Sequence, residues 1–215
     1  MATIRKWSNV QVALQSALAA AVTISAISKA SEGVVSYTGT DPSNGDYVLV
    51  TAQGMSQVNN RVFRVASVDS GADTFELEGE NTTDYDTFSS GSFQVITFGT
   101  TVTGILGLQS SGGDSPLEDN TTIHDAVRVE TPGLPNNANF SLEMIWDPAD
   151  AGLIAMSAAS KAQAERAMRF TWPDGAKYLF TGWVSASAAP GGTAQQRVTT
   201  AAQITARGVG TFYAS

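Results

Sequence analysis

The stretch MRFTWPDGAKYLFTGWV, residues 168–184, decides the fold class. Apolar residues at 168, 170 and 172 alternate with Arg169 and Thr171, which is the two-residue period of a strand with one buried face. Pro173-Asp174-Gly175 is the composition of a tight turn, and an aromatic-rich strand is predicted after it over 177–187. The stretch therefore predicts an antiparallel hairpin.

Other segments around this hairpin also have the composition of strands. Residues 140, 142, 144 and 146 are large and apolar, so they should share one face of a strand. Strands are predicted at 8–15, 23–28, about 126–131, 139–146 and 195–205. A helix over 9–20 is the alternative for the first of these, because Ala17 to Ala21 favours a helix.

One helix is predicted between these strands, from Asp147 to about Ala164. Asp147 can cap it, Pro148 suits the first helical position, and Asp150 favours the positive end of the helix dipole. On a helical wheel the apolar residues fall on two sides, one with Ile154 and one with Leu153. A helix with two apolar sides should contact two surfaces, one of which a neighbouring subunit could supply.

Residues 32–98 differ from the rest in charge and pattern. They hold two basic and ten acidic residues, a net charge of −8, whereas the remainder is neutral. Strands are predicted at 34–38, 47–51, 61–68 and 74–77, and turn-forming residues separate them. This spacing indicates a small β-barrel or sandwich inserted into the chain.

The whole chain of 215 residues is therefore predicted to be α+β and mainly β. The core is an antiparallel β-sandwich or barrel with one flanking helix, formed by residues 1–31 and 99–215. The module at 32–98 is a separate all-β unit. It interrupts the core between a strand at about 22–30 and its continuation near 100–108. A Ser-, Gly- and Asp-rich segment at 109–125 is predicted to be a long mobile loop.

Composition excludes several function classes. The chain has no cysteine, which excludes disulfides and zinc–thiolate sites, and no apolar run is long enough to insert into a membrane. An acidic surface repels nucleic acid. The segment after Met1 lacks the apolar run of a signal peptide, so we expect no export through a secretion signal.

No motif indicates catalysis, a cofactor or a metal. His124 is the single histidine, and its neighbour Asp125 would point to the opposite face of a strand, so a hydrolase dyad is not expected. Glu76, Glu78 and Glu80 could attract Ca²⁺, but a solvated acidic face is the better interpretation. Three of the four tryptophans lie in predicted strands, where buried anchors are expected.

The order of motifs from His124 onward resembles that of the major tail tube proteins of long-tailed phages, especially those with non-contractile tails. The resemblance rests on the strand ending in Ile145-Trp146-Asp147-Pro148, the short helix, and the Pro173-Asp174-Gly175 hairpin. It continues in the strand Phe180-Thr181-Gly182-Trp183-Val184. It spans about 105–213 and, more loosely, 4–30. The module resembles a small β-module that recurs in phage tail proteins.

The resemblance implies a structural subunit without enzymatic activity or cofactor. Six copies would form a ring, and stacked rings would form a hollow tube that conducts DNA into the host without binding it specifically. Implied partners are further copies of the chain, the tape-measure protein, and the tail terminator and tail-tip proteins. The implied location is the virion tail, with the host cytoplasm during assembly. The module at 32–98 would lie on the tube exterior.

Three groups of residues are candidates for the assembly. The candidate inter-subunit helix positions are Ala151, Leu153, Ile154, Met156 and Ala158. The candidate inter-ring loop positions are Gly112, Gly113, Asp114, Leu117 and Asp119. The candidate lumen face, made of small polar side chains and one acid, consists of Ser141, Glu143, Ser185, Thr199 and Thr205, and Arg169 and Arg197 could share it.

The alternative hypothesis is a tail-tip or adhesin-like protein that binds the host surface. It would use the acidic module and exposed aromatic residues on it, namely Tyr37, Tyr47, Tyr85 or Phe88.

Overall fold

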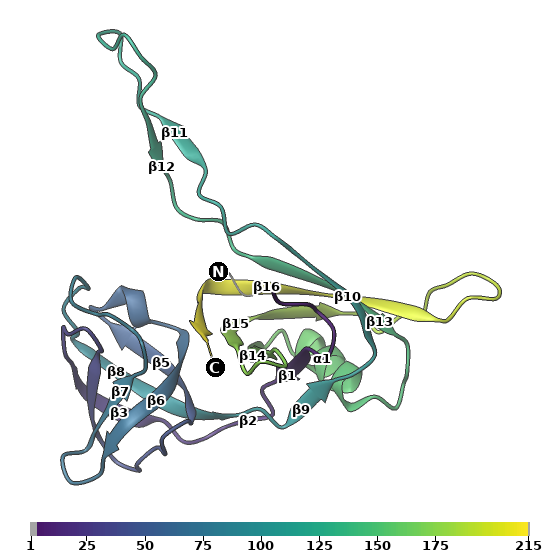
Figure 1. Ribbon diagram of the computed structural model, residues 1–215, viewed down its shortest axis with the longest axis horizontal. Coiled ribbons are helices and arrows are strands. Elements are labelled where there is room, and N and C mark those ends of the chain that lie inside the picture. The colour runs from purple at the N-terminus through teal and green to yellow at the C-terminus, as the bar shows by residue number, and fades with distance from the viewer. Residues whose placement is uncertain (1–3, 215) are drawn as a thin grey trace.

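The computed structural model describes residues 4–214. The expectation that the chain has no secretion signal rests partly on residues 1–3, which lie outside the described residues. The described chain is mainly β, with one α-helix and a single 3₁₀ turn, η1 (Ser56–Val58). The strands form two seven-stranded antiparallel sheets and one two-stranded ribbon (Figure 1). The expected α+β, mainly β class is confirmed.

The first sheet, here called the core sheet, has the order β10-β13-β16-β15-β14-β1-β9. Its members are β1 (Gln11–Leu14), β9 (Thr100–Val102), β10 (Ile105–Ser111), β13 (Asn139–Ile145), β14 (Glu165–Thr171), β15 (Lys177–Ala186) and β16 (Thr199–Tyr213). β9 and β10 each pair on one side only, so the core sheet has two open edges.

The predicted hairpin joins β14 to β15. Thr171 lies opposite Lys177, the amide of Gly175 donates to the carbonyl of Trp172 over 3.0 Å, and Gly175 has φ 89°. Only glycine adopts that left-handed conformation without strain, so the turn residue fixes the register of both strands.

One face of the core sheet curls around an apolar interior. Phe140, Leu142 and Met144 of β13 point into it, as the alternation predicts, together with Phe170 and Phe180 of the hairpin. The rings of Phe140 and Phe170 meet edge to face with centroids 5.4 Å apart. Trp146 is only partly buried, and its indole nitrogen donates to the carbonyl of Ala188.

Helix α1 (Ala151–Lys161) packs against this interior and beside β9. Gly152 permits the close approach, because a Cβ there would lie 2.5 Å from the Cα of Val102. The expected cap at Asp147 is wrong: Asp150 is the N-cap, and its carboxylate accepts from the amide of Leu153 over 2.7 Å. Asp147 instead closes the preceding turn through the amide of Ala149.

The second sheet is a closed barrel. Its strands are β2 (Ala17–Leu18), β3 (Val22–Ile27), β4 (Val34–Thr38), β5 (Tyr47–Gln53), β6 (Arg61–Asp69), β7 (Thr74–Leu77) and β8 (Ser90–Thr97). The sheet with the order β8-β3-β4-β7-β6-β5 closes into a barrel because β5 also pairs with β8. The short strand β2 pairs with the last residues of β8. Phe63, Phe75 and Phe93 fill its interior.

Two strand expectations change here. The strand at 8–15 forms as β1 and the helical alternative is wrong, but β3 pairs with β4 and β8 of the barrel and is not a core strand. The barrel strands therefore begin at Ala17. The chain enters and leaves the barrel side by side, since the amide of Gly99 donates to Oγ of Ser16 over 3.0 Å.

Residues 112–138 form an arm that stands clear of the rest of the molecule (Figure 1). It contains the ribbon β11 (Leu117–Asp119) and β12 (Glu130–Pro132). The expected core strand at 126–131 is wrong, because these residues lie in the exposed arm and only the last two belong to β12. The last strand begins at Thr199 and runs to Tyr213, later than predicted.

Asp150→Ala should lower the free energy of unfolding by about 1 kcal/mol, because the amide of Leu153 loses its acceptor. Asp150→Asn keeps an acceptor oxygen and should retain most of the stability. Denaturant unfolding followed by circular dichroism measures both variants. An equal loss in both would contradict the capping role.

Candidate functional site

The outward face of the core sheet is divided into a covered half and an open half. Neighbouring residues on this face are Ser141 of β13, Gln203 of β16 and Ser185 of β15, which lie side by side in register. All three are exposed, whereas Leu142, Ile204 and Val184 beside them are buried in the interior. The sheet alternates polar outside with apolar inside, so this half is a hydroxyl- and amide-rich surface.

The five candidate lumen residues all lie on this open half. Ser141, Glu143 and Ser185 are exposed, and Thr199 and Thr205 are half-buried. The hydroxyl of Thr205 donates to Oδ1 of Asn139 over 2.8 Å, a cross-strand contact that orders the surface. The structure thus brings together the residues that the sequence pattern grouped.

The covered half carries the barrel. Leu179 and Ala167 from the outward face of β15 and β14 are buried against Val62 and Ile96 of the barrel. Along β15 this coverage extends past the β-bulge between Leu179 and Thr181 and ends after Thr181, which is buried. Beyond it, Trp183 is 42 % exposed.

Polar contacts also hold the barrel against the core sheet. The hydroxyl of Thr181 donates to the carbonyl of Asn60 over 3.1 Å, and the amide of Arg64 donates to the phenol oxygen of Tyr213 over 2.7 Å. Burial raises the pKa of Tyr213 to about 12, so its phenol stays protonated over the neutral range. Apolar packing and directional hydrogen bonds together give a rigid attachment.

Arg169 lies within this contact and not on the open half. Its guanidinium sits over the rings of Phe98 and Tyr47, 4.9 and 5.3 Å from their centroids. Such cation–π contacts are stronger where the charge is partly removed from water. Arg197, by contrast, borders the open half.

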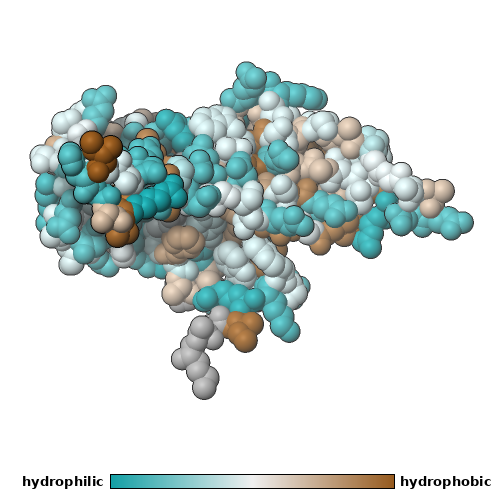
Figure 2. Space-filling view, turned by 90° about the horizontal axis from the view of Figure 1, so that it is seen from above, coloured by the Kyte–Doolittle hydropathy of each residue, from teal (hydrophilic) through white to brown (hydrophobic). Residues whose placement is uncertain are grey.

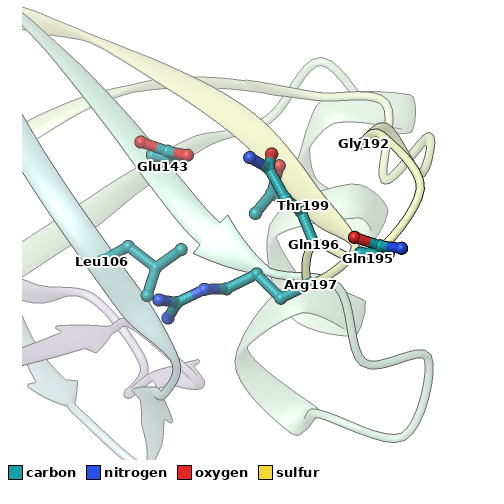
Figure 3. A pocket seen from close by; sticks show the side chains of 7 residues that line it. All are labelled: Leu106, Glu143, Gly192, Gln195, Gln196, Arg197 and Thr199. Atoms are coloured by element: carbon teal, nitrogen blue, oxygen red, sulfur yellow. The ribbon is translucent and has the colours of Figure 1, made fainter.

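Arg197 belongs to the 187–198 loop, which projects from the end of β15 and lines an open groove of about 650 Å³ (Figure 3). The groove is lined by Leu106, Glu143, Gly192, Gln195, Gln196, Arg197 and Thr199. Among the described residues no ion pair joins Glu143 to Arg197. The polar lining offers solvated groups without a convergent catalytic set.

Helix α1 turns one side inward and leaves the other open. Leu153 and Met156 are buried in the interior of their own chain, whereas Ile154 is 53 % exposed and Ala151 and Ala158 are exposed. An apolar groove of about 350 Å³ runs along Ile154 and Ala158 to Trp146 and Pro148. The helix therefore has the two apolar sides that the helical wheel predicts. The side with Leu153 is buried within the chain, and only the side with Ile154 is accessible to another chain.

The arm carries the candidate inter-ring residues. All five are exposed; Leu117 and Asp119 belong to β11, and Gly112, Gly113 and Asp114 lie at the base. Figure 2 shows strongly apolar surface on the left, the side on which both the arm and the barrel lie in Figure 1. Sequence reasoning missed three apolar residues of the arm that are each more than three quarters exposed, namely Ile123, Val127 and Leu134.

The chemical candidates from the sequence do not converge on a site. His124 is exposed on the arm, and the carboxylate of Asp125 accepts from the amide and hydroxyl of Thr122. The expected solvated acidic face is only partly correct, because Glu78 pairs with Arg64 and Glu80 with Arg61.

In residues 4–214 no group of three or more His, Asp and Glu side chains could hold a metal ion. No helix in the same residues is long and apolar enough to cross a membrane. Of the four tryptophans, Trp7 and Trp183 are about half exposed, contrary to the expected role of Trp183 as a buried anchor.

An open polar sheet face, a helix with one uncovered apolar side and a projecting arm are typical of a structural subunit that contacts other chains. A family model described as phage tail tube protein, TTP, matches residues 53–215, about three quarters of the chain. The chain belongs to this family and is a structural component of the phage tail tube, located in the virion tail. No curated protein matches it.

Leu179→Ala should lower the free energy of unfolding by about 2–5 kcal/mol, because it leaves a cavity where barrel and core sheet meet. Ser185→Ala, on the same face of β15 but in the open half, should change it by about 0.5 kcal/mol or less. Denaturant unfolding compares the two. Similar small effects would mean that the barrel is not fixed through Leu179.

Proposed function

We propose that six copies of the chain form a ring and that rings stack into a hollow tube that conducts DNA into the host. The observation that carries the proposal is the divided core sheet. Its inward face is packed, part of its outward face is polar and open, and both of its edges are unpaired. Such a sheet is incomplete alone, and a ring of identical head-to-tail contacts covers its edges without leaving free ends.

The open half of the sheet lines the tube in this proposal. Ser141, Ser185 and Thr205 offer small neutral groups, and Glu143 adds negative charge. DNA binds proteins mainly through cations that neutralise its phosphates, so a lining of this kind lets DNA slide without being held. The charge on the face is partly balanced already, since Arg207 pairs with Glu165 over 2.8 Å.

The open side of α1 lies against the neighbouring subunit of the same ring. Its groove is apolar, and the small side chains of Ala151 and Ala158 allow close approach on both sides of Ile154. Burial of Ile154 in the ring would supply the part of its apolar contact that the single chain lacks.

The barrel is an inserted module on the tube exterior. It closes its own sheet and has its own apolar interior, so it needs no neighbouring copy to be complete. It sits on the covered half of the core sheet, away from the proposed lining. The aromatic residues that an adhesin would expose are buried or half-buried there: Tyr37, Tyr47, Tyr85 and Phe88.

The partners follow from the tube. Before ejection the tape-measure protein occupies the channel, and terminator and tail-tip proteins close the two ends. Assembly takes place in the host cytoplasm, and the tail is of the long, non-contractile siphophage type. The arm and the N-terminal segment order on the next ring.

Ile154→Asp should abolish rings and tubes while leaving the single chain folded, because Ile154 is half-exposed and a carboxylate in the seam between subunits would lose its water. Leu153→Asp should instead prevent folding, because Leu153 is 4 % exposed. Negative-stain microscopy and circular dichroism give the two readouts. Normal tubes from Ile154→Asp would exclude α1 from the ring contact.

The absence of cysteine allows a labelling test of inside and outside. Ser70→Cys lies in the turn after β6 of the barrel, and Ser185→Cys lies on the open half of the core sheet. After assembly, biotin–maleimide and streptavidin should decorate tubes of the first variant along their whole length. Tubes of the second should stay undecorated except at their ends. The reverse pattern would place the barrel inside and the sheet outside.

A further inference from the structure

The core sheet has a gap between its two edges. β9 pairs with β1 only from Val12 to Leu14, so, among the described residues, residues 4–11 have no strand on that side. Across the gap β10 begins at Ile105 and pairs only with β13. An open groove of about 380 Å³ separates residues 7–12 from 105–108, and it is here called the slot.

The slot is lined by polar groups, among them Ser8 and Asn9, and by apolar side chains that lead into the interior. Val12 is buried, and Val10, Ile105 and Leu108 are partly buried against the same cluster. The backbone of β10 presents an unpaired edge on one side of the slot. Apolar side chains beside an unpaired edge are the features to which an extended peptide adds as a strand.

The arm contains a segment with the pattern of such a strand. Residues 126–131 alternate Val127 and Val129 with Arg128 and Glu130, the reason that a core strand is predicted there. In the structure Val127 is 76 % and Val129 43 % exposed, and the segment has no sheet except the three-residue ribbon with β11.

The arm's own contacts hold this segment in an extended form. Arg128 pairs with Asp119 over 3.2 Å and with Glu130 over 2.9 Å, and the amide of Asn120 donates to the carbonyl of Val129. Charged side chains of the segment are therefore engaged within the arm, whereas the two valines are exposed to water. A segment ordered in advance loses little conformational entropy on binding.

Charge also favours the slot as the destination of the arm. Residues 112–138 hold five acidic residues and one basic residue, a net charge of −4. Residues 4–16, which form one side of the slot and lead into it, hold Arg5 and Lys6 and no acid, a net charge of +2 of which Arg5 is balanced by Asp174 at 2.7 Å. Opposite charges steer and orient an encounter between the two surfaces.

We propose that the strand 126–131 of one copy inserts into the slot of a second copy and completes the core sheet of that copy. The arm leaves its own body directly after β10 and projects away from it, so the occupant belongs to another chain (Figure 1). This inference rests on the proposed stacking of rings. It assigns to the arm a particular receiving site, in which Val127 and Val129 join the apolar interior.

Cross-linking between two variants of this cysteine-free chain tests the insertion. Val129→Cys places a thiol on the arm, and Leu108→Cys places one in the wall of the slot. One variant carries a size tag, the two are mixed before assembly, and the tubes are oxidised. We expect most of the cross-linked protein to be the mixed dimer on a non-reducing gel, and neither variant alone should give that band.

A matched control replaces Leu108→Cys by Ile154→Cys, which places the thiol in the groove along α1. Mixed dimers with Leu108→Cys and few with Ile154→Cys support the insertion. Tubes that cross-link preferentially through Ile154→Cys, or through neither position, overturn it and leave tube formation standing. If the unmodified chain forms no tubes under any condition, the proposed function itself fails, and the two failures are thus distinct.

Discussion

A backbone donor or acceptor at the edge of a sheet needs a partner, and the two halves of this chain meet that requirement differently. The barrel closes on itself when β5 pairs with β8 as well as β6. The core sheet stays open between β9 and β10. One half is thus complete within a single chain, whereas the other keeps two open edges that a further chain can cover. Membership of the tail tube family gives that incompleteness a use.

The same constraint explains how one sheet can serve two purposes. Long strand β15 passes from the covered half to the open half, and the bulge between Leu179 and Thr181 lies just before the change. The outward side chains of Leu179 and Thr181 still contact the barrel, and from Trp183 onward they face water. A bulge raises local twist, so the two halves need not face the same direction. The barrel can therefore be fixed firmly without lying over the polar surface.

Local sequence predicts what local chemistry determines. The turn at Gly175 and the alternation through Phe140 to Met144 predict the hairpin and β13, because turn geometry and strand period depend on neighbouring residues. The sequence points to the wrong N-cap because Asp147 and Asp150 can both cap a helix and only the finished helix selects one. It also places β3 in the wrong sheet, because the pattern of a strand does not encode its partner. The helical wheel puts Leu153 and Ile154 on different sides of the helix. It does not show which of the two sides faces the chain's own interior. Residues 126–131 read as a strand because they have that pattern without a sheet in the chain to receive it.

The contact between Ser16 and Gly99 brings the two ends of the barrel segment together, so the barrel is a self-contained insertion. Entry and exit of the polypeptide lie within one hydrogen bond of each other, so a different domain with closely spaced termini could replace the barrel without stretching β1 or β9. With the barrel on the tube exterior, as proposed above, such an exchange would change the outer surface of the tube and leave its lining unchanged. Under the same proposal, a foreign domain inserted at this position would be displayed in a regular array along the tube.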